Sequence, residues 1–139
     1  MVWTPAETLK DISVVSVLWE DLSVGPNMLA VTKETIQTDI ELKLRLAGLR
    51  VVTEEEAVLL PGSPRVHVTT FVGPVAEVSL VEVKLMQRVR LDRNAQSVYS
   101  ATWQKNSVSW NVHAQFVRDQ IKDVVDQFVN AWLSVNPKK

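Results

Sequence analysis

The feature that most constrains the fold of this sequence is a two-residue hydrophobic period in its valine-rich segments. In residues 65–72, Val66, Val68 and Val72 share one parity, and in residues 76–91 apolar and charged side chains alternate. Successive side chains of a β-strand point to opposite faces, so this period is typical of strands with one buried face. The 25 valines, against 14 leucines, favour the same structure. We expect strands at residues 12–19, 49–52, 65–72, 76–91 and 97–105.

Two other segments carry the 3.6-residue period of amphipathic helices. Residues 33–47 follow Thr32, a good N-cap, and precede Gly48, which suits the left-handed residue that ends a helix. Residues 114–134 predict a second helix. The apolar stripes are Ile36, Ile40, Leu44 and Ala47, widened by Leu42 and Leu46, and Val117, Ile121, Val124, Phe128, Trp132 and Val135, broadened by Val125 and Val129.

The order of these elements predicts the fold class. A sheet with one apolar face and two amphipathic helices bury their apolar surfaces together when the helices cover that face. We therefore expect an α+β two-layer sandwich. Its mainly antiparallel sheet of four to five strands is covered on one face by two helices, in the order β-α-β-β-β-β-α. The length of 139 residues suits a single domain, residues 1–139.

Local patterns add detail to the strands and loops. Val78 and Leu80 have the opposite parity to the valines that follow, which predicts either a β-bulge near residues 80–81 or local burial on both faces of the strand. Residues 54–64 contain two prolines and a glycine, which predicts a loop. The last strand is expected to place three residues on one side: Tyr99, Ala101 and Trp103.

Composition excludes several classes of function. The 15 Lys and Arg nearly cancel the 16 Asp and Glu, so the chain lacks the basic footprint of a nucleic-acid binder, and we expect no nucleic-acid partner. There is no cysteine, which excludes disulfides, thiol catalysis and cysteine-based zinc sites. The longest strictly apolar run, residues 57–60, is far shorter than the roughly 20 residues of a membrane-spanning helix, so we expect no transmembrane segment.

The first residues do not predict export. They lack the basic start and apolar core of a secretory leader. We expect a periplasmic or envelope location if a leader upstream of Met1 was removed, and a cytoplasmic location otherwise.

Tryptophan is the most unusual residue type, with five Trp against one Tyr and three Phe. An indole combines a large apolar face with one hydrogen-bond donor and therefore suits both cores and interfaces. Trp103 and Trp132 lie on apolar stripes, which predicts that they fill the core. Trp3 and Trp110 lie in irregular segments, and we expect these two to contact a partner.

A basic row is the second candidate for partner binding. Lys84, Arg88 and Arg90 alternate along the polar side of the long strand, and Arg93 follows them. With Arg93, the row could meet an acidic or phosphate ligand. The interpretation that we favour from sequence is edge protection, in which charges prevent a sheet edge from pairing with other chains.

No catalytic constellation is visible. His67 and His113 have no partner at a metal-ligand spacing, and general acid–base catalysis needs a positioned partner. The four glycines fit turns or a helix end, so no phosphate-binding loop or nucleophile elbow is present. We expect no catalytic residue, no metal and no cofactor.

Two segments carry a resemblance to known proteins. LAVTKETIQTDIELKLRLAGLRV (residues 29–51) and VDQFVNAWLSVNP (residues 125–137) are similar to small uncharacterised bacterial proteins. In outline the element order also resembles two-layer α+β domains of bacterial envelope proteins, namely the amino-terminal domain of the Tol-system translocation protein and the lipopolysaccharide-assembly lipoprotein. The resemblance implies a protein–protein interaction in the bacterial envelope and carries over no catalytic residue. Such lipoproteins have an acylated cysteine, which this chain lacks.

Three functional hypotheses follow. The first is a non-enzymatic binding or assembly domain that holds a protein partner, or a second copy of itself, with its sheet face, its edge or an exposed Trp. The second is a small-ligand-binding or hydrolytic protein with a pocket between helices and sheet, in which His67 or His113 is a polar group. The third is a structural subunit of an oligomer.

Overall fold

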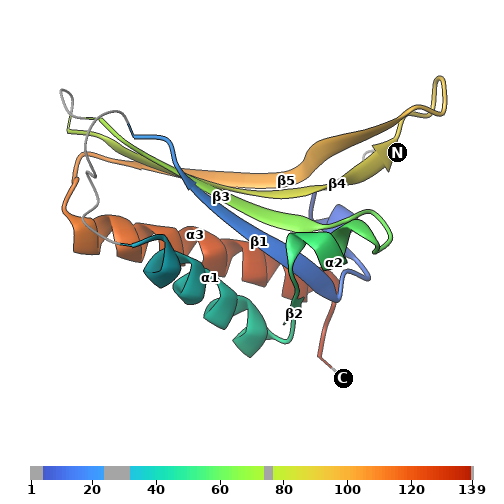
Figure 1. Ribbon diagram of the computed structural model, residues 1–139, viewed down its shortest axis with the longest axis horizontal. Helices are drawn as coiled ribbons and strands as arrows, with labels where there is room; N and C mark the ends of the chain where they lie inside the picture. The colour runs from blue at the N-terminus through green and yellow to red at the C-terminus, as the bar shows by residue number, and fades with distance from the viewer. Residues whose placement is uncertain (1–4, 24–31, 74–76, 139) are drawn as a thin grey trace.

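The protein folds into a sheet layered on two helices, as seen in a computed structural model that describes residues 5–23, 32–73 and 77–138 (Figure 1). Helices α1 and α3 lie side by side under one face of the sheet. This arrangement confirms the predicted α+β two-layer sandwich. The elements in chain order are η1 (Pro5–Leu9), β1 (Val14–Asp21), α1 (Lys33–Ala47), β2 (Arg50–Val51), α2 (Glu54–Val58), β3 (Arg65–Val72), β4 (Ser79–Arg90), β5 (Ser97–Ser109) and α3 (Ala114–Val135).

The sheet is mixed, with its five strands in the order β2-β1-β3-β4-β5. β1 is parallel to both β2 and β3, whereas β3, β4 and β5 are antiparallel neighbours. The predicted antiparallel meander is therefore present from β3 to β5. A two-residue period shows which face of a strand is buried but not which strand lies beside it, so the parallel half was not visible in the sequence.

Helix α2 shows that the prediction of a loop at residues 54–64 is wrong for residues 54–58, whereas residues 59–64 form no helix or strand, as predicted. The chain runs from β1 through α1 to β2, then returns past β1 through α2 to β3. Crossover connections between parallel strands are nearly always right-handed, and two crossovers in opposite directions must then lie on opposite faces. α2 accordingly contacts β1 on the face away from α1 and α3, where it covers Ser16. We call this the outer face.

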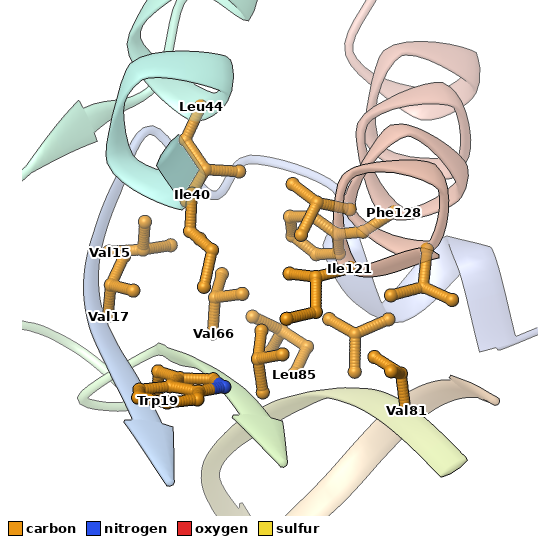
Figure 2. Packing of buried hydrophobic residues seen from close by; sticks show 14 of the residues in the cluster. Val15, Val17, Trp19, Ile40, Leu44, Val66, Val81, Leu85, Ile121 and Phe128 are labelled. Atoms are coloured by element: carbon orange, nitrogen blue, oxygen red, sulfur yellow. The ribbon is translucent and has the colours of Figure 1, made fainter. Parts of the chain in front are cut away.

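The hydrophobic core fills the space between the sheet and the two long helices (Figure 2). Ile40 and Leu44 reach it from α1, and Ile121 and Phe128 reach it from α3. Both predicted helical stripes are confirmed in their central residues. The buried residues on them are Ile36, Ile40, Leu44, Ala47, Val117, Ile121, Val124, Val125, Phe128 and Trp132.

Two leucines that were expected to widen the first stripe are exposed instead. Leu42 and Leu46 are 53% and 73% exposed. Each lies two residues after a buried residue, about 200° around the helix, because a residue advances by roughly 100°. They therefore face away from the core, and that part of the prediction is wrong.

The ends of α1 are confirmed as predicted. Thr32 Oγ1 accepts a hydrogen bond from the Thr35 backbone N–H at 3.2 Å. Gly48 adopts φ +110°, a left-handed conformation that residues with a Cβ rarely occupy. In the described residues, 5–23, 32–73 and 77–138, no helix has the length and hydrophobicity required to cross a membrane.

The sheet contains a bulge, but not where the sequence predicted it. Leu85 pairs with Trp103 and Met86 pairs with Ala101, so Thr102 is an extra residue in β5. The expected bulge near residues 80–81 is absent from the β4–β5 register. The expectation failed because Ser79, although polar, is fully buried. The core-facing residues of β4 therefore keep one parity from its first residue, and no bulge is needed there.

The bulge also separates residues that were predicted to share a side. Trp103 faces the core, where its ring meets that of Phe128 edge-on at 5.5 Å between centroids. Tyr99 pairs with Arg88 and lies on the outer face, over Arg65. An extra residue reverses the parity of everything on one side of it.

Candidate functional site

The predicted basic row lies on the outer face, but its members have different environments. Lys84 Nζ forms an ion pair with Glu82 Oε1 at 3.0 Å, whereas Arg88 Nη2 donates to Ser63 Oγ at 3.0 Å. Arg90 is exposed near the end of β4. The edge-protection interpretation is wrong, because β4 is paired with β3 on one side and β5 on the other.

A pocket of about 250 Å³ lies between α2 and the outer face. Its walls come from α2, from the first residues of β1 and β3, from the turn before β3, and from the β4–β5 pair. Segments far apart in the sequence meet here because the crossover through α2 brings that helix over the sheet. The lining residues are Ser16, Glu54, Ala57, Val58, Ser63, Arg65, Arg88 and Tyr99.

Ser63 organises the polar side of this pocket. Its hydroxyl donates to the Val58 carbonyl at 3.2 Å and accepts from Arg88, and its carbonyl accepts from the Tyr99 hydroxyl at 2.8 Å. It has a positive φ of 47°, a strained conformation for a residue with a Cβ. These contacts hold the turn before β3 in one position.

Arg65 is the central charge of the pocket. Its guanidinium forms an ion pair with Glu54 Oε1 at 3.2 Å and lies 5.7 Å from the centroid of the Tyr99 ring. Its Nε is buried and has no hydrogen-bond partner among the described residues. Burial raises the pKa of the Tyr99 phenol above its ordinary value, so this group remains a neutral donor at physiological pH.

The sequence identified only part of this pocket. Arg88 was predicted as a binding residue, whereas Lys84 and Arg90 do not line the pocket. Glu54, Arg65 and Tyr99 were missed because α2 and the β5 bulge were not predicted. One signal was present: Thr53 and Glu56 have the S/T-x-x-E spacing of a capping box, which predicts a helix start.

Trp110 lies just beyond the end of β5 that is far from the pocket under α2, where it borders a hollow with residues 111–113 before α3, and is 78% exposed. It directly follows β5, two residues after Val108. Val108 pairs with Leu80 of β4, and Leu80 pairs with Phe71 of β3, so three apolar residues lie side by side across the sheet. Leu80 and Val108 are 36% and 62% exposed. We call Phe71, Leu80, Val108 and Trp110 the apolar row. Trp3 lies outside the described residues.

The remaining tryptophans belong to the core. Trp19 Nε1 donates to Thr70 Oγ1 at 2.9 Å, and Trp132 Nε1 donates to the Ile12 carbonyl at 2.7 Å. Both indoles are more than nine-tenths buried with their donors satisfied. The prediction that Trp103 and Trp132 pack in the core is confirmed.

The two histidines lie apart from each other and from the pocket under α2. His67 Nε2 is 2.6 Å from Glu20 Oε1, on the outer face. His113 is exposed at the start of α3 and makes no side-chain capping hydrogen bond to that helix. Within the part of the chain that the structure describes, no group of three or more His, Asp or Glu side chains is arranged to hold a metal ion.

The fold thus belongs to the class of two-layer α+β domains with an open mixed sheet. No protein-family model matches the chain, and the curated proteins contain no match to it. Two features of the molecule are candidates for binding: the pocket under α2 and the apolar row.

Proposed function

We propose that this chain is a non-enzymatic binding domain that holds a protein partner on the apolar row of its outer face. The observation that carries the proposal is Trp110, which leaves 78% of its surface in water. Trp is among the residues that most often dominate the binding energy of protein interfaces, because its burial removes a large apolar area from water. A tryptophan this exposed gains most when a partner covers it.

The surroundings of Trp110 support the same proposal. Val108 on β5 and Leu80 on β4 continue the apolar surface from Trp110 toward the middle of the sheet. A stable interface buries about 800 Å² on each partner, more than one residue provides, so the partner has to extend along this row. The helices α1 and α3 cover the other face of the sheet and leave this one open (Figure 1).

We also propose the bacterial cell envelope as the setting. The support is the resemblance of residues 29–51 and 125–137 to small bacterial proteins, and of the element order to envelope domains. The coding sequence upstream of Met1 tests this. A leader ending in a lipidation cysteine supports an envelope location, and an upstream stop codon in frame, with no leader, contradicts it.

Replacing Trp110 by Ala tests the partner proposal. The immobilised chain is used to capture its partner from native cells, and the dissociation constant of the purified pair is then measured by calorimetry. We expect W110A to weaken binding by about 30-fold, which corresponds to a hot-spot loss of about 2 kcal/mol. The matched control is L46A, because Leu46 is a similarly exposed apolar residue, at 73%, on α1 in the other layer.

Two outcomes would contradict the proposal. One is an unchanged dissociation constant for W110A, and the other is an equal loss for L46A. If light scattering shows that the wild-type chain forms a dimer and W110A a monomer, the partner is a second copy of the chain. That result identifies the partner and leaves the binding surface as proposed.

A second candidate function is small-ligand binding, favoured by the pocket between α2 and the sheet. Neither His67 nor His113 lines that pocket, so the hydrolytic form of this alternative gains no support from it. The ligand-binding form is developed below.

A further inference from the structure

The pocket under α2 carries an uncompensated positive charge. Two guanidinium groups, those of Arg65 and Arg88, line it together with one carboxylate, that of Glu54. Arg65 forms an ion pair with Glu54, whereas Arg88 is held by the neutral hydroxyl of Ser63. These three charged groups leave a balance of one positive charge, which a single monovalent anion would neutralise.

One donor in this pocket has no acceptor. Arg65 Nε is buried and lacks a hydrogen-bond partner among the described residues. An unsatisfied buried donor costs about 1–3 kcal/mol, and more when it belongs to a charged group. This atom is shielded from solvent, so an anion in the pocket supplies the acceptor once the Arg65 side chain, released from its ion pair with Glu54, turns toward the cavity. Because guanidinium groups bind planar carboxylates through two parallel N–H···O bonds, a carboxylate fits this requirement well.

Apart from the hydroxyl groups of Ser16, Ser63 and Tyr99, the rest of the lining is apolar. Ala57 and Val58 of α2 and the ring of Tyr99 border the space beside the arginines. The pocket measures about 250 Å³, somewhat below the roughly 300–1,000 Å³ of sites for drug-sized ligands. Its size therefore suits a small molecule with one charged end and one apolar end.

We propose that this pocket binds a small monocarboxylate with an apolar or aromatic body. The carboxylate lies between Arg65 and Arg88, and the body packs against Val58 and the Tyr99 ring. Glu54, whose side chain is 46% exposed, gives up its ion pair with Arg65 but stays at the rim of the pocket, so the site keeps its balance of one positive charge. A doubly charged phosphate is disfavoured, because its second charge would be repelled by Glu54 without a third cation in the pocket.

This site is independent of the partner surface proposed above. Arg88 pairs with Tyr99 near one end of β4, whereas Leu80 pairs with Val108 near the other end. The eight residue steps from Leu80 to Arg88 span about 26 Å at roughly 3.3 Å per step. Failure of one proposal therefore does not affect the other, and each is tested by its own variant, W110A for the partner surface and R88Q for the pocket.

An NMR titration of the full chain tests the site, with benzoate as the probe. We expect benzoate to shift the backbone amide signals of Ala57, Ser63 and Arg65 in a saturable manner. Benzamide, its neutral analogue, and inorganic phosphate at the same concentration should leave these signals unchanged. The R88Q variant should bind benzoate at least about tenfold more weakly, because a charge-assisted hydrogen bond contributes about 1.5–3 kcal/mol.

Two further variants sharpen the test. Arg90 lies on the same strand and face as Arg88 but outside the pocket, so R90Q is the matched control and should bind benzoate as the wild type does. E54Q removes the group that competes for Arg65, and we expect it to bind benzoate more tightly than the wild type. Unshifted core amide signals show that each variant is folded.

Several results would overturn the proposal. If benzamide shifts the same signals as benzoate, the pocket recognises only the apolar body. If phosphate binds equally well, or if R90Q loses as much affinity as R88Q, the attraction is general electrostatics. Absence of any saturable shift with benzoate would also reject the site.

Discussion

At the scale of single residues, two ion pairs join the long helices α1 and α3. Arg118 Nε donates to Asp39 Oδ2 at 2.6 Å, and its Nη2 donates to Oδ1 at 3.1 Å, so the pair joins α3 to α1 with two bonds. Lys43 and Asp126 form a second bridge at 2.8 Å. The hydrogen bond from Arg118 holds the pKa of the Asp39 carboxyl below its ordinary value, against the opposing effect of burial.

Asp39 therefore makes folding stability depend on pH in a defined direction. A carboxyl whose pKa is lowered by folding stabilises the native state at pH values above its unfolded pKa of about 3.9. That stabilisation is lost as the pH falls through the lowered native pKa. We expect D39N to be less stable than the wild type from pH 7 down to about 4, and the difference to shrink at lower pH. Urea unfolding at pH 7, 4 and 2 measures it.

Asp123 provides the control for this experiment. It is exposed on α3, the same helix as Arg118. D123N should therefore change the free energy of unfolding much less than D39N at pH 7. A difference between D39N and the wild type that stays constant down to pH 2 would contradict the assignment.

Buried polar residues mark the limit of prediction at this scale. Gln120 is 5% exposed, and it donates to the Ser107 carbonyl at 3.0 Å while accepting from Ser79 Oγ at 2.9 Å. These bonds tie α3 to β4 and β5. A hydrophobic period identifies only apolar core residues, so a glutamine satisfied by distant partners could not be found in this way.

At the scale of elements, α2 depends on its ends more than on its length. It has five residues, far fewer than the roughly 12–15 that make an isolated helix marginally stable. A reciprocal capping box between Thr53 and Glu56 closes its start, and Ala57 anchors it at 3% exposure. One wall of the pocket is thus held by a cap and a single buried methyl group.

Removing the cap should loosen α2 without unfolding the protein. Replacing an N-cap threonine by alanine costs about 1 kcal/mol, which is about a fivefold change in a local opening equilibrium. We expect T53A to accelerate hydrogen exchange of the Ala57 backbone amide, which donates to the Thr53 carbonyl at 2.9 Å, by about this factor. Mass spectrometry or NMR measures the rate. T32A, at the N-cap of α1, should leave that amide unchanged, and equal effects would contradict a local role for Thr53.

Element length also explains which parts of the fold were predictable. The bounds of α1 and β3 were predicted to the residue, and α3 to within one residue, because each contains several repeats of its period. α2 is too short to show a period. The β5 bulge depends on the register with β4, which one strand's sequence does not contain.

At the scale of the whole molecule, uneven coverage of the sheet creates both candidate sites. α1 and α3 bury one face, whereas α2 covers the outer face only near β1 (Figure 1). The crossover that forms this partial cover also brings Glu54 beside Arg65. Sequence patterns identified Arg88 and Trp110 as candidates, but the residues that complete the pocket meet only through this topology.

Because the covered face carries the core, its central residue should dominate stability. Phe128 is fully buried between α3 and the sheet, edge-on to Trp103. Truncating a buried Phe to Ala costs about 3–5 kcal/mol, a large share of the roughly 5–15 kcal/mol that stabilises a typical domain. We expect F128A to lower the free energy of unfolding in urea by this amount.

The same helix supplies the comparison that separates burial from helix propensity. Phe116 lies in the first turn of α3 and is 40% exposed, so F116A makes the same chemical change on the same helix but leaves little or no cavity. We expect F116A to cost less than about 1 kcal/mol, in line with surface substitutions. If the two variants lose equal stability, the energy of this fold does not reside in the layer between helices and sheet. A large loss confined to F128A shows that most of the stabilising energy lies in the layer between the helices and the sheet. Residues on the outer face can then serve binding at little cost to folding stability.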